Sequence, residues 1–163
     1  MIRTTVLAGA ALALLLPAAA LAAPSTADFL AKASASDKFE VAAGKLAETH
    51  GGSAAVKRFG RHMVTDHTKS THMVEHAAIT SDQHTPPPQL TDDQKAMIAD
   101  LQGKRGKAFD DAYIADQKKA HDEALHLMQD YAQNGGDPKL KATAAKIVPV
   151  VQEHIEMLNK LSG

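Results

Sequence analysis

The stretch that decides the fold is residues 54–79, AAVKRFGRHMVTDHTKSTHMVEHAAI. Its apolar side chains recur every three or four residues, the spacing that puts them on one face of an α-helix. The residues on that face are Val56, Phe59, Met63, His67, Val74 and Ala78. The pattern predicts a long helix with one buried face, and it places the imidazole of His67 in the middle of that face.

Three further long helices are predicted, at about residues 26–50, 107–133 and 138–161. Paired glycines end the first two, and Pro138 opens the last at the helical position where proline is best tolerated. Alanine and lysine are plentiful, aromatic residues make up only 4% of the chain and tryptophan is absent, which favours helices over sheets. The sequence therefore predicts an all-α protein.

The segment His84–Gln89, HTPPPQ, separates two predicted helical hairpins. Three consecutive prolines enforce an extended backbone and end any helix. Thr91 and Gln94 then have the spacing of a capping box, which opens a shorter helix that reaches Gly103. Short turns within each hairpin and a long connection between them predict a ferritin-like four-helix bundle, with one crossover connection that contains the extra short helix.

Residues 1–22 have the pattern of a secretory signal peptide. Arg3 precedes a long run of alanine and leucine that Pro17 interrupts, and the residues at 20–22 form a suitable cleavage site. A cleaved signal leaves residues 23–163 as one domain and predicts a periplasmic or secreted protein without an integral membrane span. A retained membrane anchor is the alternative.

Positive and negative charges are balanced and mixed along the chain, with 18 Lys and Arg against 19 Asp and Glu. No basic patch favours nucleic acid or an anionic membrane surface as a partner. The chain has no cysteine, so it forms no disulfide and has no thiol for lipid attachment. Nucleophile motifs, phosphate-binding glycine loops and paired-carboxylate motifs are absent from the sequence, which disfavours a conventional hydrolase and an organic cofactor.

Four side chains that can bind metals are predicted to point into one core, each from a different long helix: Glu40, His67, His121 and His154. A buried imidazole or carboxylate without a partner costs about 1 to 3 kcal/mol, so such groups pair with each other or share an ion. Counted from the hairpin turns, their positions differ by roughly five or six residues, or about 8 Å along a helix. We expect a site for one transition-metal ion, zinc, copper, iron or manganese, because imidazole binds all of them.

Two other interpretations stay open. The same four groups can form a buried Glu/His hydrogen-bond network without an ion, in a non-catalytic helical envelope or interaction protein. An enzyme that acts through a bound metal ranks below both a metal-handling or stress-response protein and this interaction protein. The sequence does not specify the oligomeric state, and it leaves association with the cell envelope open.

Other polar residues give weaker signals. His72 and His76 stand four residues apart and could bind a metal at the surface. Neighbours of the inward histidines point about 100° away from them on a helix, which predicts solvent exposure. Asp66 and Asp122 are such neighbours, and His62 and His126 are also expected to face outward.

Four segments also carry a family resemblance: FEVAAGKLAE from Phe39, VKRFGRHMVTDH from Val56, FDDAYIADQKKAHDEAL from Phe109 and IVPVVQEHIEML from Ile147. In this order and spacing they resemble an exported bacterial ferritin-like family of unknown function, which is often labelled an outer-membrane protein. The resemblance spans nearly the whole region after the signal peptide. It implies a helical fold and an envelope location.

Ferritin-like di-iron proteins use a glutamate on each of two helices and a Glu-x-x-His motif on each of the other two. This chain keeps Glu40 and both motif histidines in comparable places, but Val64 and Val151 stand where the motif carboxylates would be. His121 replaces the remaining glutamate. The resemblance therefore implies a mononuclear, histidine-rich site, and it argues against a di-iron oxidase or an iron store.

Overall fold

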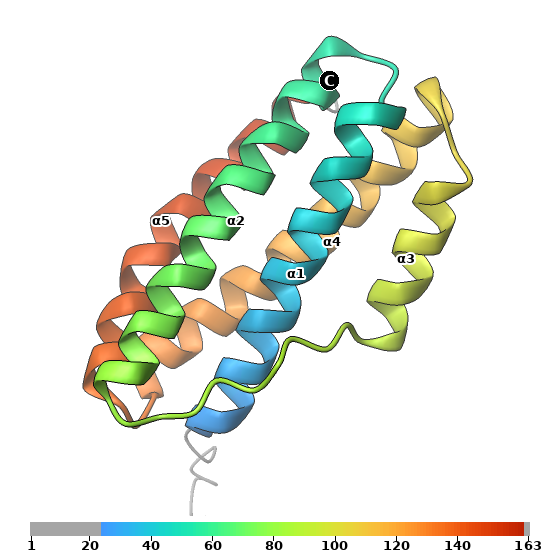
Figure 1. Ribbon diagram of the computed structural model, residues 1–163. Coiled ribbons are helices and arrows are strands. Elements are labelled where there is room, and N and C mark those ends of the chain that lie inside the picture. The colour runs from blue at the N-terminus through green and yellow to red at the C-terminus, as the bar shows by residue number, and fades with distance from the viewer. Residues whose placement is uncertain (1–23, 162–163) are drawn as a thin grey trace, which may run out of the picture.

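The computed structural model describes residues 24–161, and the predicted signal peptide at residues 1–22 lies outside them. Every regular element in the described range is a helix, so the predicted all-α class is confirmed. The helices are α1 (Thr26–His50), α2 (Ala54–Thr80), α3 (Asp92–Gln102), α4 (Gly106–Asn134) and α5 (Pro138–Leu161). Figure 1 shows the four long helices side by side and the shorter α3 against α1 and α4. Within residues 24–161, no helix is both long enough and apolar enough to cross a membrane.

Side chains that cap the helix starts explain several of these boundaries. Ser25 Oγ and Ser53 Oγ each accept a hydrogen bond from the backbone N–H three residues on, at 3.0 and 3.1 Å. Thr91 and Gln94 form the predicted capping box at the start of α3. Asp137 Oδ1 accepts from the N–H groups two and three residues on, both at 2.9 Å, and so begins α5. Each cap satisfies donors that the helix itself leaves free.

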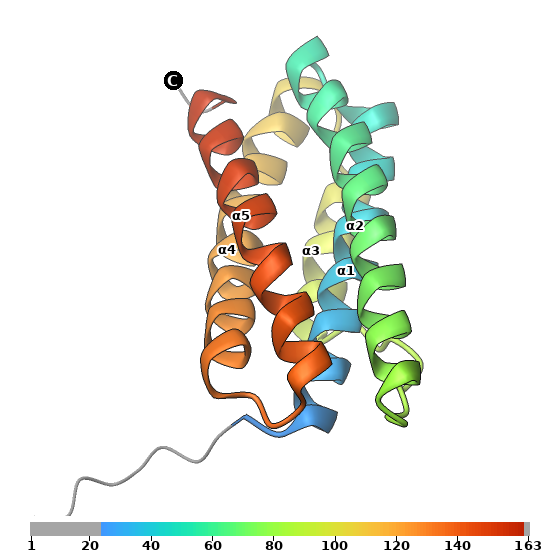
Figure 2. The ribbon, with the colours of Figure 1, turned by 90° about the vertical axis from the view of Figure 1, so that its left-hand side faces the viewer.

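The long connection between α2 and α3 makes α2 and α4 run in the same direction. At one end, Asp110 near the start of α4 accepts hydrogen bonds at 2.8 Å from the N–H groups of Gly52 and Ser53, in the turn before α2. At the other end, Ser81 after α2 donates to Asp137, in the turn after α4, at 2.9 Å. Each of the four long helices packs against two others, as Figure 2 shows from the side.

Two glycines allow α1 and α2 to approach closely. A Cβ atom on Gly44 would lie 2.7 Å from the carbonyl oxygen of Gly60, and one on Gly60 would lie 2.6 Å from Cβ of Ala47. This contact fixes the register of the two helices. Asp37 lies about two turns before Gly44 and His67 about two turns after Gly60, which brings Asp37 and His67 opposite each other.

The buried side chains divide into two apolar clusters with a polar layer between them. The first apolar cluster includes Phe29, Leu30, Val74, Met128, Tyr131, Leu140, Ile147 and Val151. The second apolar cluster includes Phe39, Phe59, Met63, Leu101, Phe109, Tyr113 and Leu158. The polar layer consists of Asp37, Glu40, His67, Gln117, His121 and His154. All four long helices contribute to this layer, which is where the candidate site lies.

Candidate metal centre

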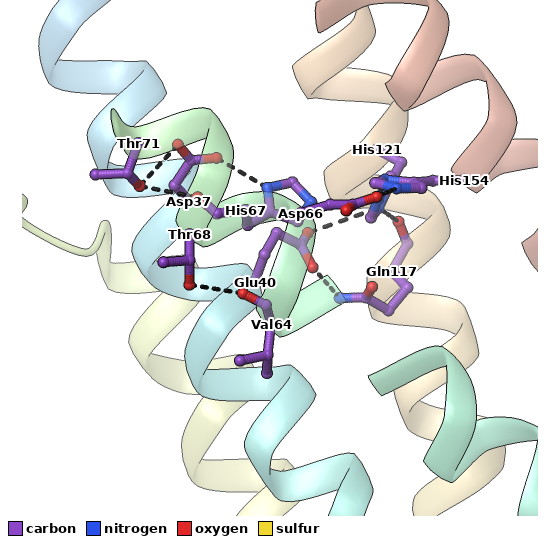
Figure 3. Close-up of polar contacts among 10 residues, drawn as sticks. All are labelled: Asp37, Glu40, Val64, Asp66, His67, Thr68, Thr71, Gln117, His121 and His154. Atoms are coloured by element: carbon purple, nitrogen blue, oxygen red, sulfur yellow. Dashed lines mark hydrogen bonds and ion pairs between the residues drawn. The ribbon is translucent and has the colours of Figure 1, made fainter. Parts of the chain in front are cut away.

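Three imidazoles meet in the polar layer, and we call them the inner site: His67 from α2, His121 from α4 and His154 from α5 (Figure 3). Their ring centroids are 5.3 to 5.7 Å apart. One ligand nitrogen of each ring lies within 4.8 Å of one from each other ring. His121 Nε2 and His154 Nδ1 are 3.3 Å apart. This separation matches two nitrogens at about 2.1 Å from one tetrahedral ion, which lie about 3.4 Å apart.

In each of the three rings, one nitrogen lies within hydrogen-bond distance of an oxygen atom. His67 Nδ1 lies 2.8 Å from Asp37 Oδ1, and His154 Nε2 lies 3.0 Å from Asp66 Oδ2. His121 Nδ1 lies 2.9 Å from the backbone carbonyl oxygen four residues earlier. Because carbonyl and carboxylate oxygens accept hydrogen bonds, these three nitrogens carry the protons of neutral rings. When all three rings are neutral, the lone pairs lie on His67 Nε2, His121 Nε2 and His154 Nδ1.

The nitrogens with lone pairs have no donor facing them. His67 Nε2 is buried and has no hydrogen-bond partner in the described part of the chain. His121 Nε2 and His154 Nδ1 face each other, and neither has a proton to share when the outer nitrogens hold theirs. A cation would satisfy all three lone pairs at once. Oxygen acceptors that fix the tautomer of each ligand histidine are usual in metal sites.

Glu40 lies beside the outer nitrogen of His121 and not among the converging lone pairs. Its Oε2 accepts a hydrogen bond of 2.6 Å from Gln117 Nε2, and its Oε1 lies 3.6 Å from His121 Nδ1. Burial raises the pKa of Glu40 from 4.5 to about 7, although the charge of His67 and the hydrogen bond from Gln117 oppose the shift. The structure thus brings three of the four predicted donors together and places the fourth against one of them.

Burial also determines the charge of the rings. Burial and the nearby charge of His67 lower the pKa of His121 to about 4. Burial lowers the pKa of His154 to about 4 despite its hydrogen bond to Asp66. Burial opposes protonation of His67 too, but the hydrogen bond to Asp37 and the neighbouring carboxylates outweigh it, so the pKa of His67 is raised. His121 and His154 are therefore neutral near pH 7, and an ion bound by all three rings would displace a proton from His67.

Negative charge surrounds the three rings. Asp37 and Glu40 are 4% and 1% exposed, and no lysine or arginine is buried in the described range. Asp66 adds a third carboxylate at the side of the layer that faces solvent. Buried carboxylates need a compensating charge or a proton. In the metal-free chain the proton on His67 offsets the charge of Asp37, and a divalent ion that displaced this proton would supply that charge instead.

A cavity of about 20 Å³ adjoins the inner site, and its walls include Asp37, Asp66, His67 and His154. One water molecule needs roughly 10 to 15 Å³ on such a measure. The cavity therefore has room for one small ligand beside the rings. An ion held by three imidazoles has a fourth coordination position that a small ligand could fill.

Two expectations about the surface of α2 were wrong in part. Asp66 was expected in solvent, but its side chain is 25% exposed and accepts the hydrogen bond from His154. His62 was expected to face outward, yet its ring is 41% exposed and lies 5.4 Å from the ring of His154. The reason is that α2 packs against α5 as well as α1, so more than one of its faces is covered. Asp122 and His126 are exposed, as predicted.

Sequence reasoning missed Asp37. It lies one turn before Glu40 on the same face of α1, and its carboxylate accepts from His67 Nδ1 at 2.8 Å and from Thr71 Oγ1 at 3.0 Å. The sequence did contain a signal for Asp37: Glu40 and His67 lie at different distances from the turn between α1 and α2, so they cannot lie directly opposite each other. A residue one turn away from Glu40, and not Glu40 itself, had to lie opposite His67.

These features define a class: an all-helical domain with a buried cluster of histidines and carboxylates that could hold a metal. The chain belongs to the DUF4142 family, a domain of unknown function that matches residues 13–161. This membership confirms the part of the resemblance that concerns a domain family of unknown function. No curated protein and no solved structure matches the chain.

Proposed function

We propose that this chain is an exported ferritin-like protein that binds one transition-metal ion at the inner site, in metal handling or stress defence. One observation carries the proposal. His67, His121 and His154 converge on one place, and an oxygen acceptor binds one nitrogen of each ring, which leaves the other nitrogen of each ring for one shared ion. In a hydrogen-bond network without an ion, His67 Nε2 stays without a partner, whereas a metal ion would take the place of the proton on His67 and satisfy all three nitrogens.

The path of the chain supports the ferritin-like part of the proposal. The connection after α2 and the helix α3 return along the length of the molecule, so α4 starts at the same end as α2 (Figure 1). A four-helix bundle with one long crossover has this arrangement, whereas an up-and-down bundle alternates. Export is supported by the signal-peptide pattern of residues 1–22.

The donor set favours a transition metal over calcium or magnesium, which prefer oxygen ligands. Zinc, copper, iron and manganese all accept imidazole ligands, and a small ligand in the adjoining cavity would complete the coordination. Val64 and Val151 offer no carboxylate at the positions of the Glu-x-x-His motifs, and Val151 is buried. A second iron would thus lack bridging ligands, which supports a mononuclear site.

Metal analysis tests this function. Protein purified from cells grown with added zinc, copper, iron and manganese should contain about one ion per chain, the number that a single three-histidine site holds. His121→Ala should lose the stoichiometric metal, while His126→Ala, at an exposed position on the same helix, should keep it. Circular dichroism confirms that each variant remains helical. Wild-type protein without stoichiometric metal, or full retention in His121→Ala, would overturn the proposal in favour of a polar layer that only fixes helix register.

A further inference from the structure

A second group of metal-binding side chains adjoins the inner site on its solvent side. This outer site consists of His62, Asp66 and His154, with one ligand atom of each within 4.8 Å of the others. Asp66 Oδ2 lies 3.2 Å from His62 Nε2 and 3.0 Å from His154 Nε2. Side-chain exposure falls from 41% at His62 through 25% at Asp66 to 1% at His154. The three donors thus form a row from solvent into the core.

His154 belongs to both sites through opposite nitrogens. Its Nδ1 lies 3.3 Å from His121 Nε2, and its Nε2 lies 3.0 Å from Asp66 Oδ2. A neutral imidazole has one lone pair and one N–H, so it binds an ion through only one nitrogen at a time. An ion in the outer site leaves the proton on Nδ1, where His121 accepts it. An ion in the inner site leaves the proton on Nε2, where Asp66 accepts it.

Asp66 also connects the two sites in space. Its side chain is a ligand of the outer site and lines the cavity beside His67 and His154. An ion that leaves His62 can therefore pass the Asp66 carboxylate and enter this cavity, where Asp37, His67 and His154 lie among apolar walls from the first apolar cluster.

We propose that the outer site is a loading station, through which a divalent metal ion reaches the inner site. The inference rests on the proposed function, because it requires that the inner site bind metal. The ion first binds His62 Nε2, Asp66 Oδ2 and His154 Nε2, and then moves to the inner nitrogens. As it moves, His154 loses the proton on Nδ1 and gains one from solvent on Nε2, so the ring stays neutral, and the proton that the ion displaces from His67 leaves to solvent. The shared ring makes the two sites mutually exclusive.

Loading kinetics test the station. Metal-free protein is mixed with Zn²⁺ in a stopped-flow instrument, and a zinc-sensitive dye reports uptake; excess chelator then reports release. His62→Ala should slow both uptake and release, each by at least about tenfold, because a tethered ligand raises the local concentration of the ion in both directions. His72→Ala, which removes a histidine that is 75% exposed on the same helix, should keep both wild-type rates.

The outcomes separate the two proposals. Wild-type protein that binds no stoichiometric Zn²⁺ would overturn the proposed function and the loading station together. Wild-type protein that loads Zn²⁺ while His62→Ala loads and releases it at unchanged rates would overturn only the loading station. An increase in release without slower uptake would also overturn it, because His62 would then be an additional ligand of the bound ion.

A variant that lacks the inner site gives a second test by equilibrium binding. His67→Ala removes one inner ligand but keeps all three residues of the outer site. Zn²⁺ should bind this variant weakly, and the double variant His62→Ala/His67→Ala should lose that weak binding. Equal residual binding by the two variants would contradict an outer site.

Discussion

The two apolar clusters and the polar layer between them are built by the same helices under different rules. In the apolar clusters, side chains stabilise the fold through close packing; the rings of Phe29 and Tyr131, for example, stack with their centroids 3.9 Å apart. In the polar layer, direction matters as well, since each histidine has one nitrogen held and one aimed at its neighbours. The apolar clusters bury the hydrophobic surface that stabilises the fold. The polar layer adds a charge requirement that folding alone does not explain.

The largest effect is expected in the second apolar cluster, from Phe39→Ala. Phe39 is fully buried and directly precedes Glu40 of the polar layer. Truncation of a buried phenylalanine leaves a cavity and should lower the free energy of unfolding by about 3 to 5 kcal/mol. Urea denaturation of metal-free protein measures the change. A loss below about 1 kcal/mol would mean that the apolar clusters are not what stabilises the fold.

Metal should stabilise the polar layer by a somewhat smaller amount. A ligand present at about 100 times its dissociation constant stabilises the folded state by about 2.7 kcal/mol. Zn²⁺ should therefore raise the melting temperature of wild-type protein and of His72→Ala, as measured by scanning calorimetry. His67→Ala should lose most of this increase. An equal increase in all three proteins would place the stabilising ion somewhere other than the inner site.

The pH dependence of the free energy of unfolding should show the cost of burying a charged carboxylate at Glu40. Its pKa is about 7 in the folded chain against 4.5 as an ordinary carboxyl. Between these pH values the folded state keeps a proton that the unfolded state has lost, so stability falls as pH rises through this window and is constant above it. The decrease is up to about 3 kcal/mol. Metal-free Glu40→Gln should lack this part of the decrease in urea denaturation at pH 4.5 to 7.5; parallel curves for variant and wild type would contradict the assignment.

The smallest effect in this series is expected from Asp37→Asn, which retains the shape of the side chain but weakens the acceptor that holds His67 Nδ1. Loss of such an acceptor typically lowers metal affinity by about 10 to 100-fold. Competition with a zinc chelator measures the affinity. Thr71→Val removes only the hydroxyl that donates to Asp37 and should have a smaller effect. Wild-type affinity in Asp37→Asn would show that Asp37 does not orient the ring.

Most of the fold could be predicted from the sequence because its determinants are local. The apolar face of α2, the capping box at Thr91 and Gln94, and Pro138 at the start of α5 act through spacings of a few residues, and each lies where it was predicted. The inward direction of His67, His121 and His154 followed from the same periodicity. Helix periodicity does not reveal which flank of a helix meets which neighbour.

The details of the site depended on that missing information. Asp37 lies opposite His67 because the glycine contact between α1 and α2 sets their register, which a count from the hairpin turn could only suggest. Asp66 faces His154 because α5 covers the flank of α2. The positions of both carboxylates depend on how separate helices pack against each other, and the periodicity of a single sequence does not determine that packing.

The most direct measurement is long-range ¹H–¹⁵N NMR of histidine side chains in metal-free and zinc-loaded protein, because it reports which nitrogen of each ring is protonated and which binds metal. We expect zinc on Nε2 of His67, on Nε2 of His121 and on Nδ1 of His154, with protons on the three opposite nitrogens. Unchanged spectra for these three rings after addition of Zn²⁺, or zinc bound only at the exposed His72 and His76, would contradict a metal site in the polar layer.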